Sequence, residues 1–287
     1  SSARAIFENA SGNQIGLRYS SVATYYNSVD ASGNLLWTKD GSEQMRLTST
    51  GLGIGTSSPA VKLHVSSSSS NNTAVGYQAG YSNTTGAQIV AVGRAALYSN
   101  TTGNYNTALG DQALHANTTG GNHTAVGLNA LYFSTTATDN TAVGNTSLQN
   151  TTTGSYNVGI GSGALLANTT ASNNTAVGYQ AGYSNTTGAS GTYIGYQAGY
   201  NTTGGFNVLI GKSAGYTLSS GTDNVVIGSN SGYSLTTGSG NTFVGSSLSF
   251  GAGFYVTTGS KNTILGNYNG NQGGLDIRTA SNYIVLL

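Results

Sequence analysis

The chain has 287 residues, only 6% of which are charged, and its formal net charge is +1. So neutral a chain lacks the basic surface of a nucleic-acid-binding protein, and no apolar run approaches the roughly 18 residues that cross a bilayer, so we expect neither nucleic acid binding nor membrane insertion. It has no cysteine, which excludes disulfides and thiolate metal sites, and its 44 glycines and 19 tyrosines are typical of turns and packed sheets.

Residues 1–65 are predicted to form a small antiparallel β-module, distinct from the rest of the chain. Residues 1–70 hold nine of the charged residues and the only Trp, Met and Pro of the sequence (Trp37, Met45 and Pro59). Apolar runs separated by turn-forming residues are expected to be strands. These runs are residues 14–19, 22–26, 35–38 and 44–47, with turn signals at 30–34 and 40–41. The serine run 66–70 is predicted to be a short connector.

Residues 71–267 contain about twelve copies of one 17-residue unit. A glycine that follows a branched aliphatic residue recurs at a spacing of 17, with a single spacing of 16 and a final one of 21. These motif glycines are Gly76, Gly93, Gly110, Gly127, Gly144, Gly161, Gly178, Gly195, Gly211, Gly228, Gly245 and Gly266. Repetition at a fixed period is the signature of an architecture in which each unit stacks on the next.

Each unit is predicted to form one coil of an all-β parallel solenoid, with two short strands and two corners. The residue before the motif glycine is branched aliphatic, the residue three before it is Thr or Val, and a mostly small residue lies between them, as in residues 73–75. This alternation indicates a strand with one buried face. A second strand is expected after the glycine, for example at residues 77–81. Asn four before the glycine and Thr-Thr-Gly sequences are expected at the corners, because Asn and Gly tolerate left-handed backbone angles.

The solenoid is expected to need partner chains. Each coil offers few large apolar side chains for the number of residues that it must order, so other chains should supply a second buried face. The small residue two before each motif glycine, such as Ala91, is the predicted point of close contact. Residues 268–287 are expected to cap the stack or to pair as terminal strands.

Two positions of the unit compensate in size. In units two to six the small residue two before the glycine is accompanied by Leu four after it, as in Ala91 and Leu97. Later the sizes invert, as in Tyr193 and Gly199. We predict that the two positions share one volume. Units one and seven, the latter with Ala176 and Gly182, do not compensate in this way.

Candidate catalytic residues are scarce in the repeats. A glycosidase needs two carboxylates about 5 to 9.5 Å apart, and residues 71–287 contain no Glu and only Asp111, Asp139, Asp223 and Asp276. Asp139 and Asp223 are equivalent but five coils apart, roughly 24 Å at strand spacing. We therefore expect no enzymatic activity, no catalytic residue and no cofactor.

The other motifs have structural explanations. The segment around Lys212 resembles the end of a phosphate-binding loop, but Phe206 stands where that loop requires glycine, so Lys212 is expected to be a solvated corner residue. His64, His115 and His123 lack the spacing of a metal site, and none is expected, although a trimer allows an axial ring of three equivalent histidines. Recurrent Tyr is expected to stack in ladders, with sugar stacking as the alternative.

The repeats resemble those of a known class of fibre protein. Asn-Thr-Ala-Val-Gly at 72–76 and 174–178, with Thr-Thr-Gly corners, resembles repeats of bacteriophage tail fibres and related trimeric surface fibres. The stretch from Leu52 to Val65 resembles the Gly-Ile-Gly-Thr-x-x-Pro-x-x-x-Leu-His-Val segment of such fibres. The strand motif is also similar to the head repeats of trimeric autotransporter adhesins, whose coil is shorter. The resemblance implies a parallel homotrimer in which each chain is a left-handed β-roll.

The resulting hypothesis is a structural and adhesive protein, the shaft or distal part of a viral tail fibre used in host attachment. Its expected partners are two identical chains, other virion tail or baseplate proteins, and a host surface glycan or protein receptor. Its expected location is the virion. The alternatives are a trimeric adhesin on a bacterial cell surface, an ice-binding solenoid and a polysaccharide-degrading tailspike.

Overall fold

The computed structural model describes six strands between residues 4 and 54, residues 71–246 and residues 250–286. Pro59, His64 and the serine run 66–70 lie outside the described residues. No helix within the described part of the chain is long and apolar enough to cross a membrane.

The N-terminal strands pair antiparallel, as predicted. They are β1 (Arg4–Glu8), β2 (Gln14–Arg18), β3 (Tyr25–Val29), β4 (Leu35–Lys39), β5 (Ser42–Thr48) and β6 (Gly51–Ile54). One sheet contains β1 and β2, and a second has the order β3-β4-β5-β6. Four of these strands overlap the predicted runs, but β3 begins three residues later than expected and β1 and β6 were not predicted. The region of β6 contains three glycines. Because glycine is depleted in strands, the residue pattern there did not indicate a strand.

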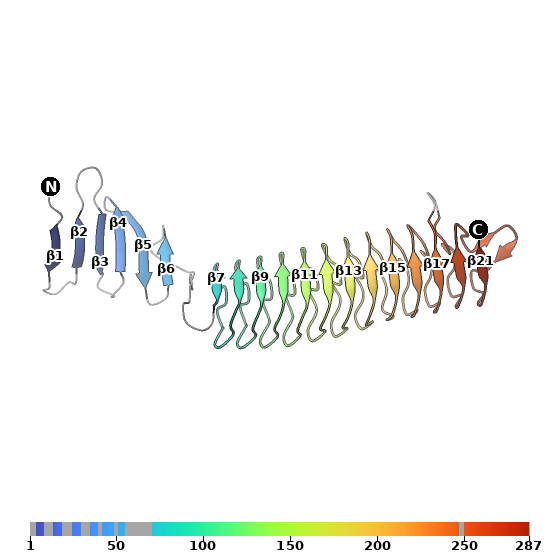
Figure 1. Ribbon diagram of the computed structural model, residues 1–287, viewed down its shortest axis with the longest axis horizontal. Helices are drawn as coiled ribbons and strands as arrows, with labels where there is room; N and C mark the ends of the chain where they lie inside the picture. The colour runs from blue at the N-terminus through green and yellow to red at the C-terminus, as the bar shows by residue number, and fades with distance from the viewer. Residues whose placement is uncertain are drawn as a thin grey trace.

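The repeats form a parallel β-solenoid, which confirms the predicted fold (Figure 1). Its thirteen-stranded sheet contains β7 (Thr73–Val75), β8 (Val90–Val92), β9 (Thr107–Leu109), β10 (Thr124–Val126), β11 (Thr141–Val143), β12 (Val158–Ile160), β13 (Thr175–Val177), β14 (Thr192–Ile194), β15 (Val208–Ile210), β16 (Val225–Ile227), β17 (Thr242–Val244), β18 (Thr263–Leu265) and β21 (Ile284–Leu286). Each strand pairs with its equivalent one unit later, so Thr124 lies opposite Thr141. The same residue types therefore form ladders along the rod.

The C-terminal residues depart from the regular coil. A small antiparallel hairpin, β19 (Asn271–Gln272) and β20 (Leu275–Asp276), precedes β21 in the chain. Strand β21 then pairs in parallel with β18, as a terminal strand of the solenoid sheet.

The core lies on the opposite side of each strand from the side expected. Ala91, Ala108 and Ala125, each two residues before a motif glycine, are fully buried inside the coil, whereas the residues that flank them are partly exposed. The expectation that the aliphatic residues face the core and that the small residue contacts another chain is therefore wrong. The interior is narrow: a Cβ on Gly159 would lie 3.1 Å from Cγ of Leu148. Only a small residue fits opposite a leucine there.

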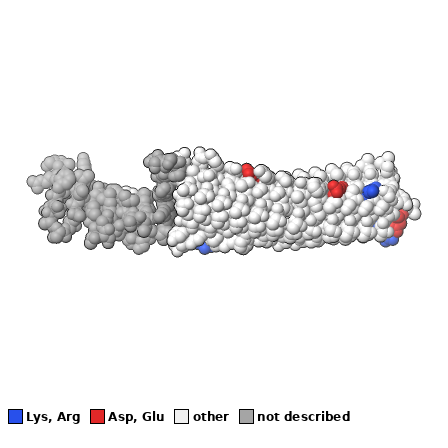
Figure 2. Space-filling model, turned by 90° about the horizontal axis from the view of Figure 1, so that it is seen from below, with Lys and Arg blue, Asp and Glu red and all other residues white. Residues whose placement is uncertain are grey.

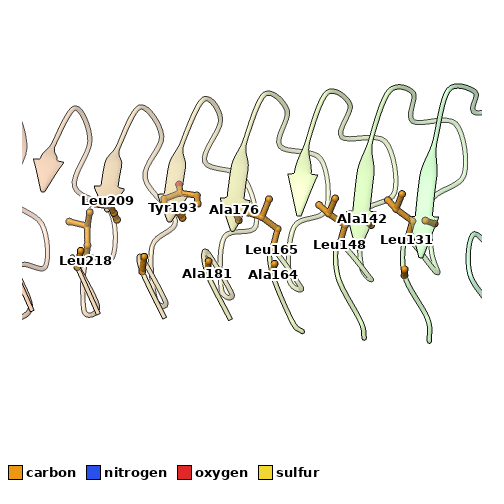
Figure 3. Packing of buried hydrophobic residues seen from close by; sticks show 14 of the residues in the cluster. Leu131, Ala142, Leu148, Ala164, Leu165, Ala176, Ala181, Tyr193, Leu209 and Leu218 are labelled. Carbon is orange, nitrogen blue, oxygen red and sulfur yellow. The ribbon is translucent and has the colours of Figure 1, made fainter. Parts of the chain in front are cut away.

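The predicted sharing of volume is confirmed (Figure 3). A Cβ on Gly199 would lie 2.7 Å from Cδ1 of Tyr193 and 2.8 Å from Cδ1 of Leu209, so these large side chains occupy the space that leucine fills in the earlier coils. The exception in unit seven is also explained. A Cβ on Gly182 would lie 2.7 Å from Cδ2 of Tyr193, because the Tyr193 ring extends from the next coil into this space.

The segment after the motif glycine forms turns, and the predicted second strand is wrong. The Ala79 N–H donates to the Gly76 carbonyl and the Asn83 N–H donates to the Gly80 carbonyl, each at 3.2 Å. Gln78 and Gly80 have φ angles of 56° and 60°. Left-handed residues at alternate positions prevent an extended strand, and a pattern of side-chain types does not reveal them.

The Asn four before the motif glycine and the glycine of Thr-Thr-Gly act through hydrogen bonds and close approach rather than through left-handed angles. The Asn140 side-chain amide donates to the Gly154 carbonyl at 2.8 Å, and its Oδ1 accepts from the Asn157 N–H at 2.8 Å. Asn140 has no left-handed φ. Gly103 of a Thr-Thr-Gly corner has none either, but a Cβ there would clash with the Gly120 carbonyl oxygen of the next coil and lie 2.6 Å from Oδ1 of Asn100. Contact between coils therefore selects glycine at this corner.

Candidate functional surface

The outward side of the solenoid sheet, here called the strand face, carries the residues one and three before each motif glycine. The first row is aliphatic and remains substantially exposed at Val75 (42%), Leu109 (47%), Ile160 (39%), Ile194 (38%) and Leu265 (42%). The second row contains only Thr and Val, and neither row contains a charged residue between β7 and β18. The strand face is thus a continuous uncharged stripe of the kind that marks a protein contact. Figure 2 shows how few charged groups the visible side of the solenoid carries.

Aromatic rings stack in two tyrosine columns, which confirms the predicted ladders; each ring is five residues after a motif glycine except Phe254, which is nine after Gly245. The first contains Tyr81, Tyr98, His115 and Tyr132, with ring centroids 4.9–5.2 Å apart. The second contains Tyr183, Tyr200, Tyr216, Tyr233 and Phe254, with ring centroids 5.0–5.2 Å apart. Because each ring covers the next, the faces inside a column are not accessible to a sugar.

Of the two described histidines, His115 belongs to a tyrosine column and His123 lies in the row four before the motif glycines. His115 stacks in the first column, and partial burial followed by the nearby Arg94 charge lowers its pKa. His123 is 1% exposed and occupies a position that is Asn in most units. Its Nδ1 accepts from the Asn140 N–H at 3.2 Å, so Nε2 is the atom that donates to the Ala137 carbonyl at 2.8 Å. Burial lowers the pKa of His123.

No axial histidine ring can be built from His123, because its side chain is enclosed in its own coil. Among the residues that the structure describes, no group of three His, Cys, Asp or Glu side chains could hold a metal ion.

The acidic residues of the repeats are separated from one another. Asp111 accepts two hydrogen bonds from Arg94 of the preceding coil, at 2.8 and 3.1 Å. Asp276 pairs with Arg278 at 2.7 Å, and this hydrogen bonding lowers the pKa of the carboxyl. Asp139 and Asp223 occupy equivalent corners on coils that are not neighbours. Lys212 is exposed beside its motif glycine, as expected.

The threonine pairs at the corners present one exposed row and not two. The first threonine of a pair bonds to the next coil, as when the Thr101 hydroxyl donates to the Thr118 carbonyl at 3.0 Å. The second threonine, such as Thr102 or Thr119, is exposed. An ice-binding face needs two exposed threonine rows in register, and these corners lack them.

The residues five before the motif glycines, here called the corner row, are left-handed in every coil, with φ between 44° and 69°. Most of its members are Asn, Asp or other small or polar residues. Tyr105, Tyr156 and Phe206 are the exceptions, and their side chains are 60%, 60% and 62% exposed. Sequence reasoning missed these three residues. They recur at the same position in the third, sixth and ninth units, and this recurrence is the signal that could have found them.

Comparisons with known proteins give no relative: no protein-family model matches the chain, and neither the curated proteins nor the solved structures include a significant match.

Proposed function

We propose that this chain forms the shaft or distal part of a trimeric attachment fibre, of the type found on viral tails, and that it has no catalytic role. The uncharged strand face along a repetitive rod is the observation that supports this proposal best. A rigid rod of stacked coils spans distance, and a long apolar stripe gives such rods a surface through which to associate.

The occupant of the strand face is a second copy of the same chain. In a parallel homotrimer each coil meets the same coil of its neighbours at the same height, because the symmetry axis runs along the rod. Any charged side chain in this interface would therefore face a like charge. The two rows of the strand face contain no charged residue between β7 and β18. Aliphatic side chains that are about two-fifths exposed in one chain, such as Val75 and Leu265, would gain burial in the trimer.

The distribution of carboxylates favours this role over polysaccharide hydrolysis. Arg94 holds Asp111, and Arg278 holds Asp276. Asp139 and Asp223 are separated by several coils, so neither supplies the other with the partner that glycoside cleavage requires. The placement on a virion follows from the resemblance of the repeats to tail fibres, with a bacterial surface adhesin as the alternative location.

Analytical ultracentrifugation of the whole chain tests the assembly. We expect a trimer for the wild-type protein and dissociation to monomers for the double variant Val126→Asp/Val143→Asp, which places like charges on two neighbouring strands of the strand face. The matched control is Thr119→Asp/Thr136→Asp at exposed corners, which should stay trimeric. Circular dichroism establishes that both variants keep their β-structure. A monomeric wild-type protein would refute the proposal.

Immunogold electron microscopy tests the location. Antibodies against the solenoid should label the tails of virions and show one orientation of the fibre. Labelling of bacterial cells without virions would favour the adhesin alternative instead.

A further inference from the structure

Three exposed aromatic rings recur at a regular interval along one edge of the solenoid. Tyr105, Tyr156 and Phe206 are members of the corner row in the third, sixth and ninth coils. Neighbouring strands of a sheet are about 4.8 Å apart, so successive rings are separated by roughly 14 Å along the rod. Two coils lie between one ring and the next, so these three rings do not stack on one another as the rings of the tyrosine columns do.

The backbone at these positions is unfavourable for an aromatic residue. The φ angles of Tyr105, Tyr156 and Phe206 are 59°, 60° and 58°, in the left-handed region that bulky side chains rarely adopt. Leu131 is also left-handed, with φ of 52°, but its side chain is fully buried and gains core packing. The three rings gain no comparable burial. Strain without a structural return is typical of functional positions.

The residues between the rings can form hydrogen bonds with a ligand. Asn122 and Asp139 follow Tyr105 in the corner row, and Asn173 and Ser190 follow Tyr156. In these two stretches a ring is followed by an amide and then by a carboxylate or hydroxyl, and Asp223 supplies a carboxylate one coil after Phe206. Polar side chains that alternate with aromatic faces suit sugars, which have both apolar C–H faces and hydroxyl groups.

The corner row is also held rigidly by the stacked coils. The Tyr105 N–H donates to the Ala87 carbonyl at 3.0 Å, and the Phe206 N–H donates to the Ala189 carbonyl at 2.9 Å. The backbone that carries each ring is thus fixed to the coil before it. A preorganised row loses little conformational freedom when it binds a ligand.

We propose that the corner row from Tyr105 to Asp223 is a binding site for an extended polysaccharide, with the three aromatic rings as stacking platforms and the intervening polar residues as hydrogen-bonding partners. The inference deepens the proposed attachment function, on which it rests, because it names the receptor class and the surface that binds it. Rings at a fixed spacing favour long glycans that reach two or three platforms over short ones that reach only one.

The test measures binding of the full chain to immobilised capsular and O-antigen polysaccharides by surface plasmon resonance. The wild-type protein should bind at least one of them, and oligosaccharides too short to span two rings should bind more weakly. The triple variant Tyr105→Asn/Tyr156→Asn/Phe206→Asn, which installs a residue that other coils carry at this corner, should lose affinity by about tenfold or more. Wild-type protein that binds none of the polysaccharides at millimolar repeat-unit concentration overturns the inference.

A rearranged variant separates the spacing of the rings from their number. Tyr156→Asn/Asn173→Tyr keeps three aromatic residues in the corner row but shifts the middle ring by one coil. We expect it to bind the polysaccharide more weakly than the wild-type protein. Equal binding by the two proteins contradicts the spacing argument.

The alternative that the rings pack against a neighbouring chain is tested with the same triple variant. Because Asn tolerates left-handed angles better than Tyr or Phe, the variant should be at least as stable as the wild-type protein and should keep its oligomeric state. Loss of trimers in ultracentrifugation would show that the rings belong to the chain interface and would overturn the glycan site. A protein that is trimeric and is found on virions by immunogold labelling, yet binds no polysaccharide, would refute this inference alone. The proposed attachment fibre would then still stand.

Discussion

The two halves of the solenoid fill the same interior volume with different side chains. In the coils from β8 to β12 a small residue on the strand faces a leucine from the opposite wall, as Ala125 and Leu131 do. In the coils from β14 to β17 the strand supplies the large residue and the opposite wall is glycine, as with Leu209 and Gly215. The comparison teaches that the fold constrains the combined volume of two positions and not the identity of either one.

Removal of the large side chain should have the largest effect in either half. We expect Leu131→Ala to destabilise the protein by about 2 to 5 kcal/mol, because it leaves a cavity in a fully buried site. Leu209→Ala should have a similar effect in the other half, although the large residue there is on the strand. Denaturation with guanidinium chloride measures both changes.

A transplanted pair sharpens this test. The double variant Ala125→Leu/Leu131→Gly gives an N-terminal coil the arrangement of the C-terminal half, and its stability should lie well above that of Leu131→Ala. A double variant as unstable as Leu131→Ala would show that the halves are not interchangeable.

Addition of a side chain to the filled half should have an intermediate effect. Gly199→Leu introduces atoms where a Cβ alone would lie 2.7 Å from Tyr193 and 2.8 Å from Leu209. We expect a loss of about 1 to 3 kcal/mol from overpacking, seen as a lower midpoint of thermal unfolding. Introduction of Tyr193→Ala into this variant should recover part of the loss. Full additivity of the two substitutions would contradict a shared volume.

The smallest effect concerns His123, which lies in the row four before the motif glycines that runs through both halves. Burial lowers the pKa of His123 from 6.5 in the folded chain, so the unfolded imidazole binds a proton more readily. The stability that neutral His123 contributes is therefore present above pH 6.5 and is lost as the pH falls through the folded pKa.

The variant His123→Asn restores the residue found at this position in most units and isolates this contribution. Stability measured by urea denaturation from pH 7.5 down to pH 5 should fall less steeply for the variant than for the wild-type protein. Parallel curves for the two proteins would exclude His123 as the source of the pH dependence.

The sequence by itself determined the repeat, the parallel solenoid and the compensation between two positions. Periodicity carries this information because equivalent residues must stack on one another in every coil. The recurrent tyrosines likewise revealed their own stacking, since a residue repeated at one position of a solenoid lies beside its copy.

The tertiary structure alone decided which side of the strand is buried and which residues are left-handed. A strand of three residues alternates in the same way whichever side faces inward, and only the width of the coil assigns the small residue, such as Ala125, to the interior. Backbone angles are likewise absent from a pattern of residue types. Tyr105, Tyr156 and Phe206 therefore became visible as strained and exposed residues only once each coil had its shape.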